Sequence, residues 1–146
     1  MAYRGKYKLK NPAKYKGDPN KIVWRSLWEL KFCKYCDFNS SVLKWSSEEI
    51  VIPYRSPVDN KRHRYFPDFV VELKNKAGET EILLIEVKPK KQTAPPKLSK
   101  SGKKTKRFFS EAKKWGVNSA KWEAAERHCE EQGWKFVILT ENELRP

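Results

Sequence analysis

The spacing of apolar residues changes several times along the chain, and each change predicts a different secondary-structure element. Residues 20–37 place apolar side chains at the 3.6-residue period of a helix, with Asp18-Pro19 before them as a cap and first-turn pair. Strand-like apolar runs follow at 49–54, 64–73, 81–88 and 134–140. The turn sequence Asn75-Lys76-Ala77-Gly78 predicts that the second and third runs pair as a hairpin.

Helical periodicity returns before the last strand. Residues 106–116 and 119–132 predict two helices separated near Gly116, with Asn118 or Ser119 as the cap of the second and Gly133 as its end. A strand that follows these helices can join the sheet through a crossover. The order of elements therefore predicts one α/β domain with a central mixed sheet of about four strands flanked by helices.

Charge is the most unusual property of the composition. The 146 residues carry 32 Lys and Arg against 18 Asp and Glu, a formal net charge of +14, while 38% of residues are hydrophobic. This is too apolar for a disordered basic tail, so we expect a folded body that binds a polyanion such as nucleic acid. No apolar run reaches the roughly 20 residues of a membrane span, and no signal peptide begins the chain, so we expect a soluble, unexported protein.

Two segments concentrate the positive charge. Residues 1–19 interleave lysines with tyrosines, which predicts a basic N-terminal arm able to contact phosphates and exposed bases, although a merely solvated terminus would look similar. Residues 89–104 form a Pro-containing loop without an acidic residue, which suits contact with a nucleic-acid backbone. The candidate nucleic-acid-binding residues are Lys90, Lys91, Lys97, Lys100, Lys103, Lys104, Lys106, Arg62 and Arg64.

Charged residues interrupt two apolar strands at corresponding places. Side chains alternate between the faces of a strand, so Glu86 and Lys88 share one face at the end of the 81–88 run. Asp68 likewise lies between Phe66 and Val70 on one face of the preceding run. If the two runs pair through the predicted hairpin, Asp68 and Glu86 converge on one point, where burial would be costly without a ligand.

A third carboxylate points inward from the first predicted helix. Glu29 falls within its apolar arc, although Glu48 or Glu49 could supply the third acid instead. Hard oxygen ligands suit Mg²⁺, with Mn²⁺ as a substitute, and such an ion can polarise a phosphodiester and activate water. Lys88 could orient that water or offset developing charge. We therefore expect a catalytic metal site for phosphodiester hydrolysis.

The cysteines allow a different interpretation. Cys33, Cys36 and Cys129 form an odd set in a chain without an export signal, so free thiols are the default expectation. A zinc site formed by Cys33 and Cys36 with His128 and Cys129 is the alternative.

These residues resemble the motifs of the PD-(D/E)xK nuclease superfamily. Glu29 lies on the first helix, Pro67-Asp68 on the second strand and Glu86-Val87-Lys88 on the third. The resemblance implies a single PD-(D/E)xK nuclease-like domain over residues 20–146. It implies Asp68 and Glu86 as metal ligands joined by the Val87 carbonyl, Lys88 as the catalytic lysine and Glu29 as the helix carboxylate.

Longer matches cover nearly the whole chain. The segments Val51-Ile52-Pro53-Tyr54, Glu86-Val87-Lys88-Pro89-Lys90-Lys91 and Trp115-Gly116-Val117-Asn118 resemble the head-completion nucleases of T-even-type bacteriophages, which are similar to the transposon-end nuclease subunit of Tn7-like elements. The resemblance implies a Mg²⁺-dependent deoxyribonuclease that acts on double-stranded packaged DNA before tail joining. It also implies that phage head or portal-neck components are partners and that the protein acts in the host cytoplasm. Retention of the protein in the virion is compatible with this role.

Two other functions fit the same residues. A non-catalytic head-neck assembly protein would use the basic surfaces to hold DNA or dock on the portal, without needing Asp68 or Glu86. A repair or transposition nuclease would have the same chemistry and a different partner.

Overall fold

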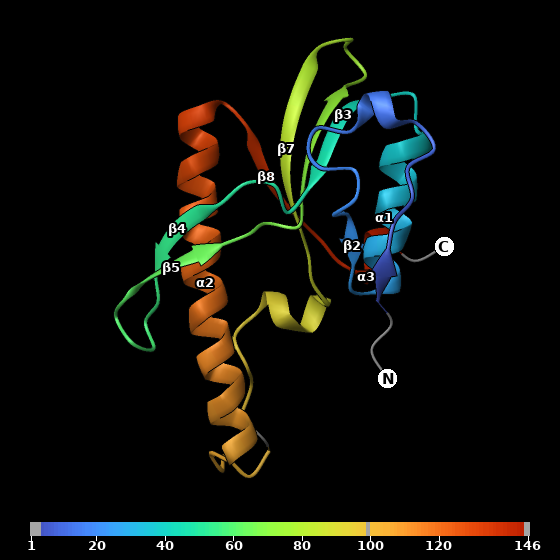
Figure 1. Ribbon diagram of the computed structural model, residues 1–146. Helices are drawn as coiled ribbons and strands as arrows, with labels where there is room; N and C mark the ends of the chain where they lie inside the picture. Colours follow the sequence, from blue (N-terminus) through green and yellow to red (C-terminus); the bar gives the residue numbers. More distant parts are fainter. Residues whose placement is uncertain (1–3, 99, 145–146) are drawn as a thin grey trace.

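A four-stranded mixed sheet forms the centre of the protein, whose computed structural model describes residues 4–98 and 100–144 (Figure 1). Its strand order is β3–β6–β7–β8. Neighbouring strands pair antiparallel from β3 to β7, and β8 joins β7 in parallel after a crossover. The strand bounds are Val42–Ser47 for β3, Phe69–Lys74 for β6, Thr80–Val87 for β7 and Lys135–Leu139 for β8. The predicted α/β class, mixed sheet and 75–78 hairpin are confirmed.

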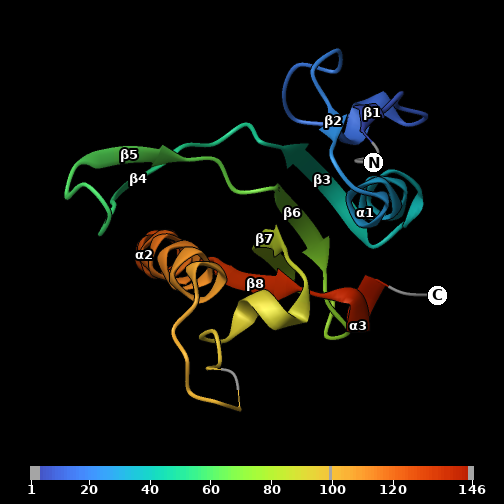
Figure 2. The same ribbon diagram turned by 90° about the horizontal axis from the view of Figure 1, so that it is seen from below.

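Two helices cover the two faces of this sheet (Figures 1 and 2). Helix α1, Leu27–Phe38, packs Phe32 into one core cluster with Val71 and Ile85. Helix α2, Lys106–Gln132, packs Trp122 and other residues against Leu84 from the opposite face. Since successive strand residues point to opposite faces, β7 supplies both cores, which explains why its sequence is almost continuously apolar.

Helix α1 begins later than its apolar pattern predicts. Its N-cap is Ser26, whose hydroxyl accepts a hydrogen bond from the Glu29 amide, so Asp18-Pro19 is not the cap. The preceding β2, Val23–Trp24, pairs with β1, Gly5–Lys6, instead of extending the helix. The helix prediction was therefore right from Leu27 onward and wrong before it.

The run 64–73, predicted as one strand, is broken at the buried Pro67. Its first residues belong to β5, Arg62–Tyr65, and the rest to β6. Strand β5 pairs with β4, Ile52–Arg55, in a separate hairpin that packs on α2 through Ile52 and Tyr65. Proline has no amide to donate to a ladder, so the chain leaves one sheet there and enters another. Strand β3 was not predicted.

The two helices predicted at 106–116 and 119–132 are one helix of 27 residues. Gly116 lies inside it, and the N-cap is Thr105, not Asn118 or Ser119. The predicted end is confirmed, because Gly133 caps the helix with a φ of 74°, in the left-handed region that glycine favours. Within residues 4–98 and 100–144, no helix is both long and apolar enough to cross a membrane.

Short helices complete the chain. Helix α3 spans Glu141–Leu144, and single 3₁₀ turns are formed by η1, Pro12–Lys14, and η2, Lys90–Thr93. Leu144 joins the core on the α1 face.

The N-terminal segment is folded onto the domain, which corrects the expectation of an arm over residues 1–19; residues 1–3 lie outside the described part. Tyr7 and Tyr15 are buried in the α1-face core, so their rings do not face a ligand. Buried Asp37 of α1 accepts hydrogen bonds from the Tyr7 hydroxyl (2.7 Å) and from the amides of Lys10 (2.9 Å) and Asn11 (3.0 Å). One carboxylate therefore ties the segment to α1.

The cysteines are free and buried. Cys33 and Cys36 lie in the core on the α1 face, whereas Cys129 lies in the core on the α2 face. The sheet separates them, so the zinc interpretation is wrong and the thiols act as small core residues.

We expect Asp37→Ala to lower the free energy of unfolding by about 3 kcal/mol near neutral pH, because three donors lose their shared acceptor. Burial by itself would raise the pKa of Asp37, but the donated hydrogen bonds outweigh it and hold that pKa below its usual value. The stabilisation that depends on ionised Asp37 is therefore complete above about 3.9, the pKa of this carboxyl in the unfolded chain. It is lost as the pH falls through the lower pKa that Asp37 has in the folded protein.

Urea unfolding as a function of pH measures this effect, with Glu130→Ala on the exposed surface of α2 as the control. A loss for Asp37→Ala no larger than that of the control would contradict the anchoring role.

Candidate active site

Asp68 and Glu86 come together at one end of the sheet. The β6–β7 register pairs Phe69 with Ile85 and Val70 with Leu84, so Asp68, one residue before β6, lies opposite Glu86. The Asp68 carboxylate also accepts a 2.7 Å hydrogen bond from the amide of Val87. The predicted convergence of the two acids is observed, and the α2 face, which carries Val70 and Leu84, is the side on which they meet.

Both carboxyl groups are largely withdrawn from water. Glu86 is 4% exposed, and Asp68 keeps only partial contact with solvent. Burial, followed by the adjacent charge of Glu86, raises the pKa of Asp68 well above its usual value, against the opposing effect of the Val87 amide. Two acids in this position repel each other when both are ionised, so a cation between them would be strongly favoured.

Residues of β5 and α2 surround Glu86. The indole N–H of Trp122 donates to its Oε2 at 3.4 Å. The Tyr65 hydroxyl is buried without a hydrogen-bond partner among the described residues, and its pKa is raised by burial and then by the neighbouring Glu86 charge. The Lys121 ammonium lies 5.6 Å from the centre of the Tyr65 ring. Trp122 was not among the predicted site residues, because its contact with Glu86 depends on where α2 crosses the sheet.

Glu29 approaches the pair from α1 but does not join it. Its negative charge contributes to the raised pKa of Asp68, and burial raises the pKa of Glu29 itself. In the described part of the chain, no group of three or more His, Cys, Asp or Glu side chains is arranged to hold a metal ion. The structure thus contains a carboxylate pair with Glu29 nearby, instead of the expected three-acid cluster.

The other two candidates for the third acid have separate partners. Glu49 accepts hydrogen bonds from the Asp18 amide (3.1 Å) and the Tyr15 hydroxyl (3.4 Å), which attaches it to the N-terminal segment. Glu48 forms an ion pair with Arg25, while its amide donates to the Asp68 carbonyl. Glu49 therefore faces away from the site, and Glu48 borders it.

Lys88 continues the line of β7 beyond the acids. Its amide donates to the Leu139 carbonyl at 3.0 Å, which keeps the chain extended beside β8. Strand alternation places its side chain on the same face as Glu86. Lys88 is half-buried, and its ammonium forms no ion pair among the described residues. A positive group is therefore available beside two buried acids.

The donor atoms fit a hard divalent cation. The nearest side-chain ligands are carboxylate oxygens from Asp68 and Glu86, and within the described residues no cluster of three or more acidic, thiol or imidazole groups forms around them. The Val87 side chain packs in the α1-face core, so only its backbone could contribute to the site. A pair of acids leaves further positions around Mg²⁺ for water and phosphate oxygens, which this ion prefers to keep.

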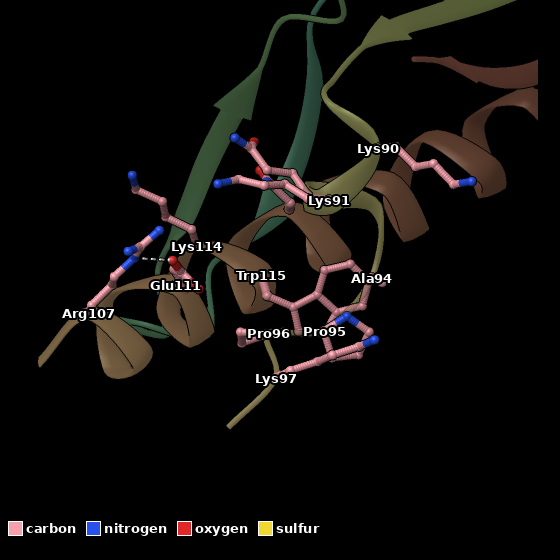
Figure 3. Close-up of a pocket in the computed structure, with 12 residues that line it drawn as sticks. Lys90, Lys91, Ala94, Pro95, Pro96, Lys97, Arg107, Glu111, Lys114 and Trp115 are labelled. Carbon is pink, nitrogen blue, oxygen red and sulfur yellow. Dashed lines mark hydrogen bonds and ion pairs between the residues drawn. The ribbon is translucent and has the colours of Figure 1, made fainter. Parts of the chain in front are cut away.

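The predicted nucleic-acid-binding residues separate into three groups. Arg62 and Arg64 are exposed on β5, and Lys100, Lys103, Lys104 and Lys106 are exposed along the approach to α2. Lys90, Lys91 and Lys97 line a pocket of about 660 Å³ between the 90–97 segment and α2 (Figure 3). Five residues of α2 that line this pocket were not predicted as site residues: Arg107, Glu111, Lys114, Trp115 and Asn118. All but Asn118 lie within the helix predicted at 106–116, but the sequence does not show that the 90–97 segment packs beside that helix.

Comparison with known proteins agrees with this geometry. A family model described as TnsA-like endonuclease N terminal matches residues 39–141, which include β3 to β8 and both acids. The chain is also 45% identical to the head completion nuclease of Enterobacteria phage T4 over 149 aligned residues, covering 99% of this chain and 95% of that protein.

We expect Asp68→Asn to raise the free energy of unfolding by about 1 kcal/mol in metal-free buffer, because the substitution removes one of two buried like charges and keeps an acceptor for the Val87 amide. Chemical denaturation in the presence of a chelator measures it, with the exposed Glu123→Gln on α2 as the control. A clear loss of stability would show that the two acids do not oppose folding.

Proposed function

This chain belongs to the family of TnsA-like endonucleases, and from that premise we propose that it is a divalent-metal-dependent DNA endonuclease acting in bacteriophage head completion. The observation that carries the proposal is the facing pair of buried Glu86 and half-buried Asp68. Lys88 lies beyond this pair, and its ammonium forms no ion pair among the described residues. A fold that needed only packing would gain nothing from two adjacent buried acids. The free-energy cost of burying two adjacent carboxylates is explained if they bind a cation together with a substrate.

Mg²⁺ or Mn²⁺ would be held by the carboxylates of Asp68 and Glu86, with the Val87 carbonyl as a further oxygen donor. When bound, such an ion polarises the scissile phosphate and lowers the pKa of a coordinated water. The chain prepares this site by fixing the acids on two adjacent strands. The Val87 amide orients Asp68, and the Trp122 indole orients Glu86.

Lys88 supplies the positive charge that the carboxylates do not. From the end of β7 its ammonium can hold the attacking water or stabilise negative charge on the phosphate as the bond to the leaving oxygen breaks. Glu29, on the α1 side of Asp68, adds negative charge to the site and is the helix carboxylate of the proposal. Buried Tyr65 and Trp122 exclude bulk water from behind Glu86.

The substrate we propose is double-stranded DNA, held through its backbone. The exposed cations are mainly lysines, whose flexible ammonium groups respond to phosphate charge more than to base identity. We therefore expect little sequence preference and binding that weakens steeply with salt.

The biological step we propose is trimming or processing of packaged DNA in filled heads before tail joining, in the host cytoplasm, with head or portal-neck components as partners. Its support is the identity to the T4 head completion nuclease over nearly the full length of both chains. A repair or transposition role would use the same site, and none of the contacts described above favours it.

We expect plasmid nicking by this protein to require Mg²⁺ or Mn²⁺ and to stop with EDTA. Asp68→Ala and Glu86→Gln should each lower the rate by at least roughly a thousandfold, because each removes a proposed metal ligand, and Lys88→Ala by roughly a hundredfold. Initial nicking rates measure this. Glu29→Gln should also lower the rate, whereas Glu49→Gln is the matched control and should leave it unchanged. Equal nicking by wild type and Asp68→Ala would mean that the activity is a contaminant.

We expect phage that carry Asp68→Asn to accumulate filled heads unable to join tails, because the proposed step is catalytic. Plaque counts and electron microscopy of infected lysates measure this, with Glu123→Gln as the control. Normal head completion by the inactive variant would instead support a non-catalytic assembly role, which needs only the basic surfaces.

A further inference from the structure

One face of the first half of α2 forms a wall of the basic pocket. Arg107, Glu111, Lys114, Trp115 and Asn118 all line it, and their spacings of four, three, one and three residues place them on one helix face. The opposite wall is the segment 90–97 that leaves β7 (Figure 3). The two walls come from parts of the chain that the sequence alone does not show to be neighbours.

The charges of this pocket are mostly uncompensated. Arg107 pairs with Glu111 at 3.0 Å, and Glu111 is the only acid among the lining residues. The remaining lining cations form no ion pair within the part of the chain that the structure describes: Lys90, Lys91, Lys97 and Lys114. Unpaired lysines from both walls give the pocket a positive potential, so the favoured ligand carries several negative charges.

The pocket lies next to the candidate active site along α2. Asn118 lies one helical turn before Trp122, whose indole donates to Glu86, and the rings of Trp115 and Trp122 are 6.0 Å apart. From the other wall, Lys90 is two residues beyond Lys88. A strand of DNA with a phosphate at Glu86 can therefore pass directly into the pocket.

The length of the surface fits a defined stretch of DNA. From Trp122 back to Arg107, α2 rises by about 22 Å at roughly 1.5 Å per residue. One strand of B-DNA advances by about 3.4 Å per nucleotide, so this surface matches about six nucleotides. Trp115, Pro95 and Pro96 give the pocket an apolar wall between the cations, suited to the sugars between successive phosphates.

We propose that this pocket binds the sugar-phosphate backbone of the cut strand of duplex DNA, over about six nucleotides on one side of the scissile linkage. The inference rests on the proposed nuclease function and assigns α2 to substrate binding, beyond the lysines of the 89–104 loop. The pocket residues determine how tightly and in which direction the strand lies, while the chemical step belongs to Asp68, Glu86 and Lys88.

The test compares two double variants that lose the same charge. Lys91→Ala/Lys114→Ala removes one cation from each wall of the pocket, whereas Lys34→Ala/Lys76→Ala removes two exposed cations from α1 and the 75–78 turn. Both are made in the Asp68→Asn background, and binding of a short fluorescent duplex is followed by anisotropy without metal at several salt concentrations. Circular dichroism checks that each variant is folded.

We expect the pocket pair to reduce the slope of log affinity against log salt by about 2, since each phosphate contact contributes about 0.9, and to weaken binding more than tenfold at ~0.1 M salt. The control pair should change the slope much less. In the active background the pocket pair should raise KM and leave kcat within about twofold, as expected for lost uniform binding.

Equal effects of the two pairs would overturn the proposal, because they would show only a loss of net charge. A loss confined to single-stranded DNA would also overturn it, since the pocket would then hold unpaired nucleotides. Failure of the proposed function is a separate result: the wild type would not nick DNA in any divalent metal, while the difference between the two pairs in duplex binding would remain.

Discussion

The structure of the site depends on two acids being held together where water cannot fully screen them. Asp68 and Glu86 face each other because β6 and β7 are joined by a tight turn whose register pairs Phe69 with Ile85. The Val87 amide and the Trp122 indole then hold the two carboxylates in place. The repulsion between these acids costs stability, and the fold can bear that cost because large core clusters lie on both faces of the sheet.

Helix α2 connects the acid pair to a larger surface. Its second half packs on the sheet and supplies the indole that contacts Glu86, whereas its first half lines the basic pocket with the 90–97 segment. A continuous helix keeps these two parts at a set distance, because every residue advances it by about 1.5 Å. The N-terminal segment contributes differently: it is tied to α1 by Asp37 and engages Glu49 away from the acids.

The elements that were predicted correctly have strong local sequence signals. The errors arose where contacts between residues far apart in the sequence determine the secondary structure. β7 is a long apolar run, the 75–78 turn has Asn and Gly, and Gly133 ends α2. Gly116 suggested a helix break because glycine weakens isolated helices, yet packing of α2 against the β4–β5 hairpin keeps it helical. β3 has a mixed pattern because Trp45 and Val42 face the core while Ser46 and Ser47 are also buried.

The order of residues along the chain by itself determined which charged groups meet at this end of the sheet. Strand alternation around the 75–78 turn brings Asp68, Glu86 and Lys88 to one face, and this follows from a local period and a local turn. Only the tertiary structure determined what surrounds these groups. It places Glu29 near the pair, whereas Glu48 forms an ion pair with Arg25 and Glu49 accepts a hydrogen bond from the N-terminal segment. It also packs the 90–97 segment beside α2. Those outcomes depend on how separate elements pack across the sheet, and no spacing within one element encodes that packing.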